Sequence, residues 1–274
     1  MPPCRPDRSV AFTLLELLVA VALLAMISVS LLSISSHVSR LWSAGESQNQ
    51  HRIRARAALE YMGREMQLAV IPINPAETNT LQFVVNPGGV GFSNHDSVFW
   101  QAPIARDQTH GELAEVGYFV RWQSNNTADL CRFLVTPDTA TNYLIYSKPY
   151  PSSWVNDAML DLVAPAGKAS HYQGVFLENA VGLWVKASRR DGSAWSGDSR
   201  LEQSLPATVE ISLVLLDSKT AARLAGQPAD AQKIRTRVVS ASTAREFLGD
   251  ASLPAYIRAG ATEVAFAVNL INSR

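Results

Sequence analysis

Residues 10–20 read Val10-Ala11-Phe12-Thr13-Leu14-Leu15-Glu16-Leu17-Leu18-Val19-Ala20, and this stretch decides the fold of the N-terminal part of the chain. It opens an apolar run from Ala11 to Leu32 in which Glu16 is the only charged residue. About 20 apolar residues, at a rise of 1.5 Å each, cross the roughly 30 Å hydrocarbon core of a bilayer. The run therefore predicts a membrane-spanning helix.

Glu16 is the informative residue of this run. An acidic side chain at the centre of a membrane helix costs roughly 2.5–3.5 kcal/mol on insertion scales, and less near the interface. Such a residue normally marks a function and pairs with a positive group at similar depth. The run contains no Lys, Arg or His. The partner must therefore come from another molecule or from a newly formed amino terminus.

With its short basic leader, the stretch resembles the N-terminal cleavage and methylation motif of type IV pilins and type II secretion pseudopilins. In that family a membrane peptidase cuts just before the Phe and N-methylates it, and the Glu pairs with the terminal amine of a neighbouring subunit. The resemblance implies prepilin peptidase cleavage between Ala11 and Phe12, N-methylation of Phe12 and an assembly carboxylate at Glu16. The family usually has Gly before the cut, where this sequence has the similarly small Ala11.

Two other interpretations of the segment are an ordinary secretory signal peptide and a plain signal anchor. A signal peptide has an apolar core of about 7–15 residues that ends in a small-residue cleavage site. The apolar core in this chain is longer, contains an acid and runs directly into helix-forming sequence. These properties favour the pilin-like interpretation.

The charges that flank the span give a mixed signal for its orientation. Arg5 and Arg8 precede it, whereas Arg40 and the arginines of residues 52–56 follow it. Of the arginines that follow the span, only Arg40 lies clearly within the about 15–20 residues that the positive-inside rule weighs. Mainly on the resemblance, we expect a single-pass protein of the inner (cytoplasmic) membrane with a cytoplasmic N-terminus and a periplasmic head.

Length and composition bound the rest of the chain. The 24 basic and 24 acidic residues balance, which leaves no electrostatic footprint for nucleic acid. Cys4 lies in the leader, so Cys131 has no partner for an internal disulfide in the mature chain, and we expect it to be a small buried hydrophobe. The expected domains are a leader at 1–11, a transmembrane helix with the N-methylation motif at 12–35, an amphipathic continuation at 36–71 and an α+β periplasmic head at 72–274.

The helix is expected to continue past the membrane as far as Pro72, because proline cannot sit in a helix interior. Ile53, Ala57 and Tyr61 repeat every four residues. We expect this stripe to pack along the head, and the arginines beside it to form a solvated face. Three further apolar residues lie next to the stripe: Leu59, Met62 and Met66.

After Pro72, segments rich in β-branched and aromatic residues alternate with Asn, Pro, Gly and Asp turns, which predicts antiparallel strands. The expected strands are 80–85, 97–101, 116–123, 130–135, 143–147, 175–187, 208–216 and 261–271. The expected helices run from Ser152 or Ser153 to Leu162, from 218 to 224 and from 230 to 248. The predicted fold class is thus α+β, with a long N-terminal transmembrane helix that continues into an amphipathic helix packed on an antiparallel sheet.

Two blocks of the expected head carry a second resemblance. Residues 174–185 with Asp191-Gly192 and Trp195, followed by residues 205–213, are similar to the strand, turn and tryptophan segment and the next strand of J-type minor pseudopilins. The helical stretch near the C-terminus resembles instead the prepilin-like proteins called Verru_Chthon cassette protein C, which share the N-terminal motif and whose role is not established. Both resemblances imply a pilin-like subunit.

The sequence offers little catalytic chemistry. Its five histidines are scattered, and it contains no His-Glu-x-x-His pair, Cys-x-x-Cys motif or phosphate-cradling glycine loop. Asp191, Ser193 and Asp198 could form an oxygen-rich calcium loop, but two carboxylates are few for a calcium cage, and a solvated hairpin turn explains the same residues. Trp184 and Trp195 are expected in the core. We expect neither enzymatic activity nor a cofactor.

These observations predict a membrane-anchored pilin-like subunit, a minor pseudopilin, that assembles through its N-terminal helix into a pseudopilus for protein secretion or a related type IV filament. The expected partners are prepilin peptidase, other pilin-like or pseudopilin subunits and the inner membrane, with no nucleic acid. The alternative is a signal-anchored surface binding module that never polymerises. Glu16 discriminates between the two, because a monomeric anchor gains nothing from a membrane carboxylate.

Overall fold

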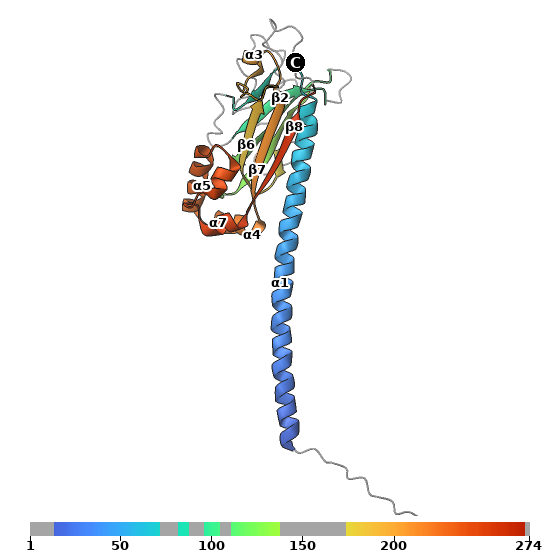
Figure 1. Cartoon of the computed structure of the whole chain (residues 1–274), viewed down its shortest axis with the longest axis vertical. Helices are drawn as coiled ribbons and strands as arrows, with labels where there is room; N and C mark the ends of the chain where they lie inside the picture. Colours follow the sequence, from blue (N-terminus) through green and yellow to red (C-terminus); the bar gives the residue numbers. More distant parts are fainter. Residues whose placement is uncertain (1–13, 72–81, 88–95, 105–110, 138–173, 272–274) are drawn as a thin grey trace, which may run out of the picture. The chain divides into compact units, whose positions relative to one another are not determined.

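The computed structural model describes residues 14–71, 82–87, 96–104, 111–137 and 174–271. The chain divides into two compact units, residues 1–49 and 50–274. Helix α1 (Leu14–Gln67) is one continuous helix that begins in the first unit and ends in the second (Figure 1). The helix ends at Gln67, a few residues before the end at 71 that Pro72 predicted. Beyond it, the Val70 N–H donates to the Gln101 carbonyl of β2 (Ser97–Ala102) at 3.0 Å, so the chain there already follows the sheet.

The second unit contains two antiparallel sheets (Figure 1). The five-stranded sheet runs in the order β1-β2-β3-β4-β5 and the three-stranded sheet in the order β6-β7-β8. The first comprises β1 (Phe83–Val85), β2 (Ser97–Ala102), β3 (Ala114–Trp122), β4 (Ala128–Val135) and β5 (Gly174–Leu177). The second comprises β6 (Ala180–Ser188), β7 (Thr208–Leu216) and β8 (Ala261–Asn269). The expected α+β class with antiparallel sheets is therefore confirmed.

The short helix α3 (Ser199–Glu202) precedes β7, and four helices lie between β7 and β8 along the chain. These are α4 (Ser218–Ala225), α5 (Pro228–Ser240), α6 (Ala244–Gly249) and α7 (Ala255–Gly260). The single helix expected at 230–248 is wrong, because Thr243 starts a new one. Its hydroxyl accepts a hydrogen bond from the Glu246 N–H, and the Glu246 carboxylate in turn accepts one from the N–H of Ser242, the residue before the N-cap. This is a variant of the capping box, in which the N-cap N–H itself is the donor.

The single strand expected at 175–187 is also wrong, because it forms two strands that belong to different sheets. A turn at Glu178 and Asn179 separates them, and Asn179 adopts the left-handed conformation (φ 62°) that asparagine tolerates better than most residues. The strand expected at 143–147 and the helix expected from Ser152 or Ser153 to Leu162 lie outside the described residues.

The second unit buries a different face of α1 from the one that the sequence pattern indicated. Ile53 is 60% exposed and Ala57 is exposed as well, so the expectation that the whole stripe packs along the head is wrong. Only Tyr61 contacts the sheet: it is 40% exposed, but its ring packs against Phe176 of β5 with centroids 5.6 Å apart. The apolar residues Leu59, Met62 and Met66 are fully buried, together with Ala55. The helix approaches β8 closely, since a Cβ placed on Gly63 would lie 2.5 Å from Cε1 of Phe266.

A buried polar cluster joins α1 to the five-stranded sheet. The Glu65 carboxylate accepts hydrogen bonds from the Tyr118 hydroxyl on β3 at 2.6 Å and from Nε of Arg132 on β4 at 3.1 Å. A second Arg132 nitrogen, Nη2, binds the other carboxylate oxygen. Burial, with the Glu65 charge beside it, raises the pKa of Tyr118 well above its usual value. The cluster therefore consists of a neutral Tyr118 hydroxyl that is hydrogen-bonded to the Glu65–Arg132 ion pair.

We expect Arg132→Met to lower the free energy of unfolding by about 3–5 kcal/mol, because it leaves the buried Glu65 charge without its cation. The double variant Glu65→Leu/Arg132→Met should recover most of this loss, since no buried charge remains. Denaturant unfolding of the full chain in detergent measures both. A matched control is Arg56→Met, which breaks an exposed Arg–Glu pair of the same helix and should cost less than about 1 kcal/mol. Equal stability of the Arg132→Met and Arg56→Met variants would contradict this account.

Candidate functional site

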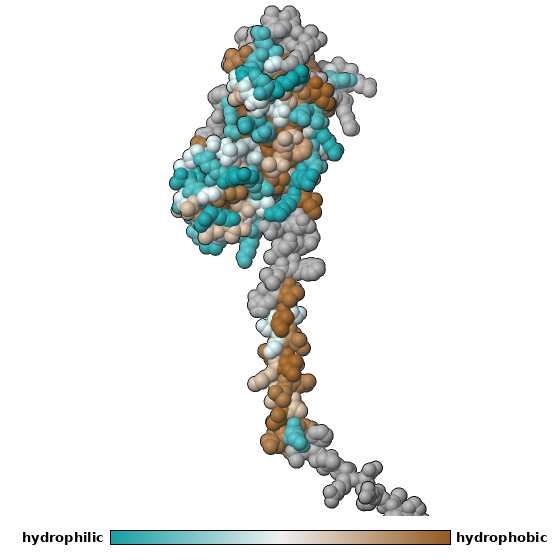
Figure 2. Space-filling view, viewed as in Figure 1, coloured by the Kyte–Doolittle hydropathy of each residue, from teal (hydrophilic) through white to brown (hydrophobic). Residues whose placement is uncertain are grey.

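The membrane-length segment of α1 is the first candidate site. Leu14–Ser36 is long and apolar enough to cross a membrane, and its 23 residues span about 34 Å at the helical rise. None of its side chains is buried, so large apolar side chains cover the surface of this segment (Figure 2). An apolar surface of this extent needs lipid or other helices around it.

Glu16 lies in the first turn of α1. A carboxylate there is favoured by the positive end of the helix dipole. The hydroxyls of Ser30 and Ser36 donate to carbonyls of their own helix, Met26 O at 3.0 Å and Ser33 O at 2.8 Å, so both hydroxyls are satisfied without water. An ionised carboxylate only accepts hydrogen bonds, so the groups that Glu16 can bind are donors and cations.

The proposed processing residues cannot be placed beside Glu16. Ala11 and Phe12 lie outside the described residues, so cleavage between them, methylation of Phe12 and pairing with Glu16 remain predictions from the sequence motif. Glu16 is the residue of this set that the structure describes, and it lies in helix α1.

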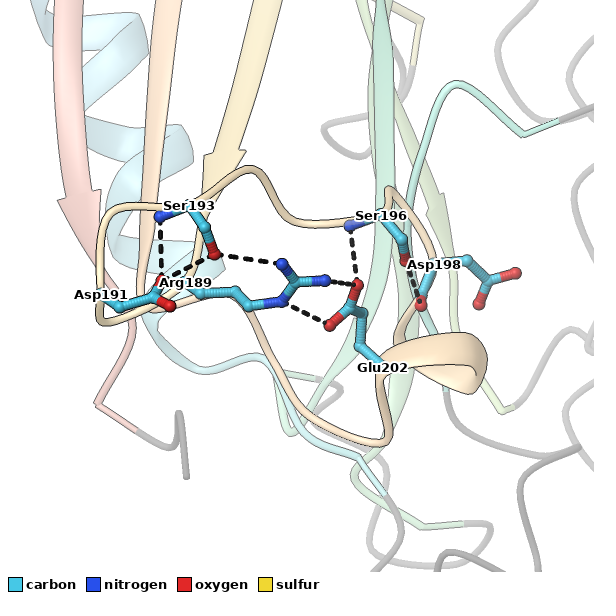
Figure 3. Close-up of polar contacts among 6 residues, drawn as sticks. All are labelled: Arg189, Asp191, Ser193, Ser196, Asp198 and Glu202. Carbon is cyan, nitrogen blue, oxygen red and sulfur yellow. Dashed lines mark hydrogen bonds and ion pairs between the residues drawn. The ribbon is translucent and has the colours of Figure 1, made fainter.

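The second candidate site is the loop between β6 and β7 (Figure 3). Asp191 accepts hydrogen bonds from the backbone N–H and hydroxyl of Ser193 at 2.9 and 2.7 Å, which lowers the pKa of Asp191. Arg189 donates hydrogen bonds to both carboxylate oxygens of Glu202, with Nε at 2.8 Å from Oε2. The Ser196 N–H also donates to Glu202, at 3.0 Å. The loop is therefore closed by an ion pair that spans thirteen residues of sequence.

The structure brings two of the three calcium candidates together. Asp191 and Ser193 bind each other, whereas the Asp198 carboxylate points away from them in Figure 3. Among the described residues, no group of three or more His, Cys, Asp or Glu side chains is placed to hold a metal ion. The contacts of Asp191 are those of an Asx turn, which is the alternative that the sequence pattern already favoured.

The same loop has a role that the sequence pattern did not reveal. The outer edge of β1 has two outward N–H groups, and both meet the loop: Val85 N–H donates to Gly197 O and Phe83 N–H to Ser199 Oγ, each at 2.8 Å. Trp195 packs edge-on against Phe83, with ring centroids 5.7 Å apart. The segment from Trp195 to Ser199 thus seals a sheet edge, and only the tryptophan hinted at this contact.

Three residues that were expected in the core lie there. Trp184 and Trp195 are 8% and 6% exposed, and Cys131 is fully buried. The Trp184 indole N–H donates to the Ala241 carbonyl at 2.9 Å, which ties β6 to the residue that follows α5. Burial raises the pKa of the Cys131 thiol to about 12. A thiol with this pKa is unreactive at neutral pH.

No family model matches this sequence, and no curated protein matches it. Among solved structures, the chain is similar to a type IV-like pilin from Thermus thermophilus, with 13% sequence identity and a TM-score of 0.38. The similarity covers 80% of this chain and 95% of that chain.

We expect the loop ion pair to titrate in acid. The hydrogen bonds from Arg189 lower the pKa of Glu202 to about 2, below the ordinary value of about 4.3 for Glu in an unfolded chain. The stabilisation is therefore fully present above about pH 4.3 and is lost as the pH falls towards 2. NMR titration of the Glu202 carboxyl should give a midpoint near 2 that rises in Arg189→Gln. Arg190→Gln removes the same charge one residue away and should leave the midpoint near 2. A midpoint near 4 in the unsubstituted chain would contradict the ion pair.

Proposed function

We propose that this chain is a membrane-anchored, non-enzymatic pilin-like subunit. The observation that carries the proposal is a membrane-length apolar helix with Glu16 in its first turn, inside a sequence that resembles the prepilin cleavage and methylation motif. An ionisable group in a membrane helix is costly and by default functional. Assembly with a second membrane helix brings a positive group of a neighbouring subunit to this carboxylate and covers part of the apolar surface.

In this proposal, prepilin peptidase cuts between Ala11 and Phe12 and methylates Phe12, whose amine then pairs with Glu16 of a neighbouring subunit. The N-terminus lies in the cytoplasm, the span crosses the inner membrane and the head lies in the periplasm. The J-type resemblance of the β6, loop and β7 segment supports a minor pseudopilin. Such a subunit joins other pilin-like subunits in a pseudopilus for protein secretion, or in a related type IV filament, without a cofactor or nucleic acid.

The second candidate function is a signal-anchored surface module that binds a ligand and never polymerises. The two compact units are compatible with this function, because an anchor and a separately packed unit are all that it requires. It gives no role to Glu16, however, and for that reason we place it second.

The first test is the mature N-terminus. When the chain is expressed with its cognate prepilin peptidase, mass spectrometry should find a protein that begins at N-methylated Phe12. Ala11→Leu is the matched variant, because a bulky residue before the cut should block processing while leaving the span unchanged. A mature terminus at Met1 or beyond residue 30 in the unsubstituted chain would remove the pseudopilin assignment.

The second test concerns the carboxylate itself. Glu16→Leu should insert more easily into the membrane by roughly 2–3 kcal/mol on insertion scales and should still be cleaved, whereas its co-purification with other pilin-like subunits should fall at least about tenfold, as expected for a lost buried ion pair. Ser30→Leu is the control, since it also makes the span more apolar but removes a hydroxyl that is satisfied within its own helix. If the Glu16→Leu protein assembles as well as the Ser30→Leu protein, the binding-module alternative becomes the better account.

A further inference from the structure

The outer strands of the two sheets differ in how they are covered. The outer edge of β1 meets the loop between β6 and β7, as described above. The outer edge of β6 is covered as well, because the Asp96 N–H donates to Leu183 O at 3.2 Å and the Trp195 N–H donates to Ala187 O at 3.1 Å. Strand β8 is the outer strand on the other side of the three-stranded sheet, and its edge is different.

Every second residue of β8 directs its main-chain N–H and C=O away from β7. Hydrogen bonds at the two ends of the β7–β8 pair fix this pattern: the Asp217 N–H donates to Gly260 O at 2.9 Å, and the Leu270 N–H donates to Ala207 O at 3.0 Å. The register between these ends is unbroken. Opposite residues of an antiparallel pair alternate between hydrogen-bonded and non-hydrogen-bonded pairs, so the even-numbered residues of β8 face β7. The outward main-chain groups of the strand therefore include those of Glu263, Ala265, Ala267 and Asn269.

These four residues form an open edge, which we call the β8 edge. In the part of the chain that the structure describes, their main-chain groups make no hydrogen bond, and Ala265, Ala267 and Asn269 are exposed. The nine-residue strand also lacks the usual protections of an outer strand, since it contains no Pro, Lys or Arg and its pairing with β7 contains no bulge. The β8 edge is thus a template on which a further strand can add.

The spacing of the β8 edge defines the class of its partner. Outward N–H and C=O groups recur at every second residue, which is about 6.6 Å along a strand. An extended polypeptide repeats the same groups at the same spacing, so it can pair with the whole edge. Addition of an extended peptide to an exposed sheet edge is an established mode of recognition, in which main-chain hydrogen bonds give affinity and alternate side chains give specificity.

Helix α1 lies beside β8 (Figure 1) and supplies charge near the edge. A Cβ placed on Gly63 would lie 2.5 Å from Phe266 and 3.0 Å from Val268, so this side of α1 faces β8. Arg56 and Arg52 precede Gly63 by seven and eleven residues, which is close to two and three helical turns. Both arginines therefore lie on the same side of α1 as Gly63, and both are exposed.

The exposed surface of this part of α1 is basic. Of its two acids, Glu65 is buried in the pair with Arg132, and Glu60 lies at the surface 3.1 Å from Arg56. One surface acid thus faces four exposed arginines between residues 52 and 67, so acidic side chains on an incoming strand complement this surface. The four are Arg52, Arg54, Arg56 and Arg64.

We propose that the β8 edge binds an extended, acidic segment of a partner protein, which adds to the three-stranded sheet as a fourth strand. Main-chain hydrogen bonds hold the segment, and the arginines of α1 select its acidic side chains. The contact uses no residue of the membrane-length helix. It therefore stands apart from the proposed function and applies equally to a polymerising subunit and to a surface binding module.

Amide hydrogen exchange of the full chain in nonionic detergent tests whether the edge is open. The outward amides of Ala265 and Ala267 should exchange at least about tenfold faster than the inward amides of Val264 and Phe266, because only the inward amides are bonded to β7. Equally slow exchange of both sets would mean that the edge is covered within the chain itself and would overturn the proposal.

The binding test uses two fluorescent peptides, Asp-Val-Glu-Val-Thr-Val-Asp and its basic counterpart Lys-Val-Arg-Val-Thr-Val-Lys. The acidic peptide should raise fluorescence anisotropy at about 50 mM salt and slow the exchange of the outward β8 amides at least about tenfold. The basic peptide should bind at least about tenfold more weakly, because it meets like charges on α1. The proposal is wrong if the acidic peptide fails to bind or if both peptides bind equally well.

Substitutions locate the bound peptide. Ala267→Pro removes one outward N–H and leaves the bonds to β7 in place, so acidic-peptide binding should weaken at least about tenfold. Ala267→Ser keeps the N–H and should bind like the unsubstituted chain. Arg52→Gln leaves the strand untouched and should weaken binding at least about threefold at low salt, whereas Lys233→Gln removes the same charge from α5 and should not.

Two outcomes of these substitutions would overturn the proposal. Binding that survives both Ala267→Pro and Arg52→Gln would place the peptide elsewhere on the protein. Self-association of the full chain that Ala267→Pro abolishes, without binding of the acidic peptide, would assign the edge to a second copy of this chain. Neither outcome affects the Glu16→Leu test, so failure of the edge and failure of the proposed function remain distinguishable.

Discussion

One buried carboxylate, Glu65, determines how the end of α1 sits in the second unit. Its side chain binds Tyr118 of β3 and Arg132 of β4, and its main-chain carbonyl accepts a hydrogen bond from the Trp100 indole of β2 at 3.3 Å. Three central strands of one sheet are thereby tied to a single helical residue. A buried ion pair of this kind tolerates little change in geometry, since any rotation of the helix would leave charges unpaired away from water. The rotation that it permits turns Gly63 towards β8, leaves Ile53 exposed and lays the half-exposed Tyr61 ring against Phe176 of β5.

The sequence predicted the elements better than their faces. Strands bounded by Asn, Gly and Pro turns were placed within a few residues, because such turns are local. The face of α1 was misassigned because this helix carries two apolar stripes, and the buried one is interrupted by Glu65 and Gly63, which hydrophobic periodicity counts against burial. The expected strand 175–187 is divided by the left-handed conformation of Asn179, and the expected helix 230–248 is divided where Thr243 caps a new helix. A single Asn or Thr barely interrupts the apolar pattern, so the pattern did not predict either division.

The candidate sites divide in the same way between local and distant contacts. The Asx turn of Asp191 and Ser193 spans two residues and was anticipated as a hairpin turn. The pair of Arg189 with Glu202, and the contact of Ser199 with Phe83 across 116 residues of sequence, depend on tertiary folding and leave no periodic signal. The membrane-length helix is the opposite case, because its length, its composition and the position of Glu16 are all visible in the sequence.

The sealed edge of β1 has a consequence for solubility. An unpaired strand edge is a template on which other chains add strands, and unchecked addition leads to amyloid-like aggregation. A membrane tether raises the local concentration of whatever it carries, so such a template would be most hazardous in an anchored protein. Because the loop residues Gly197 and Ser199 occupy both outward amides of β1, this edge cannot nucleate strand addition. In the membrane-anchored subunit that we propose, this sheet edge therefore stays inert even where neighbouring molecules collide often.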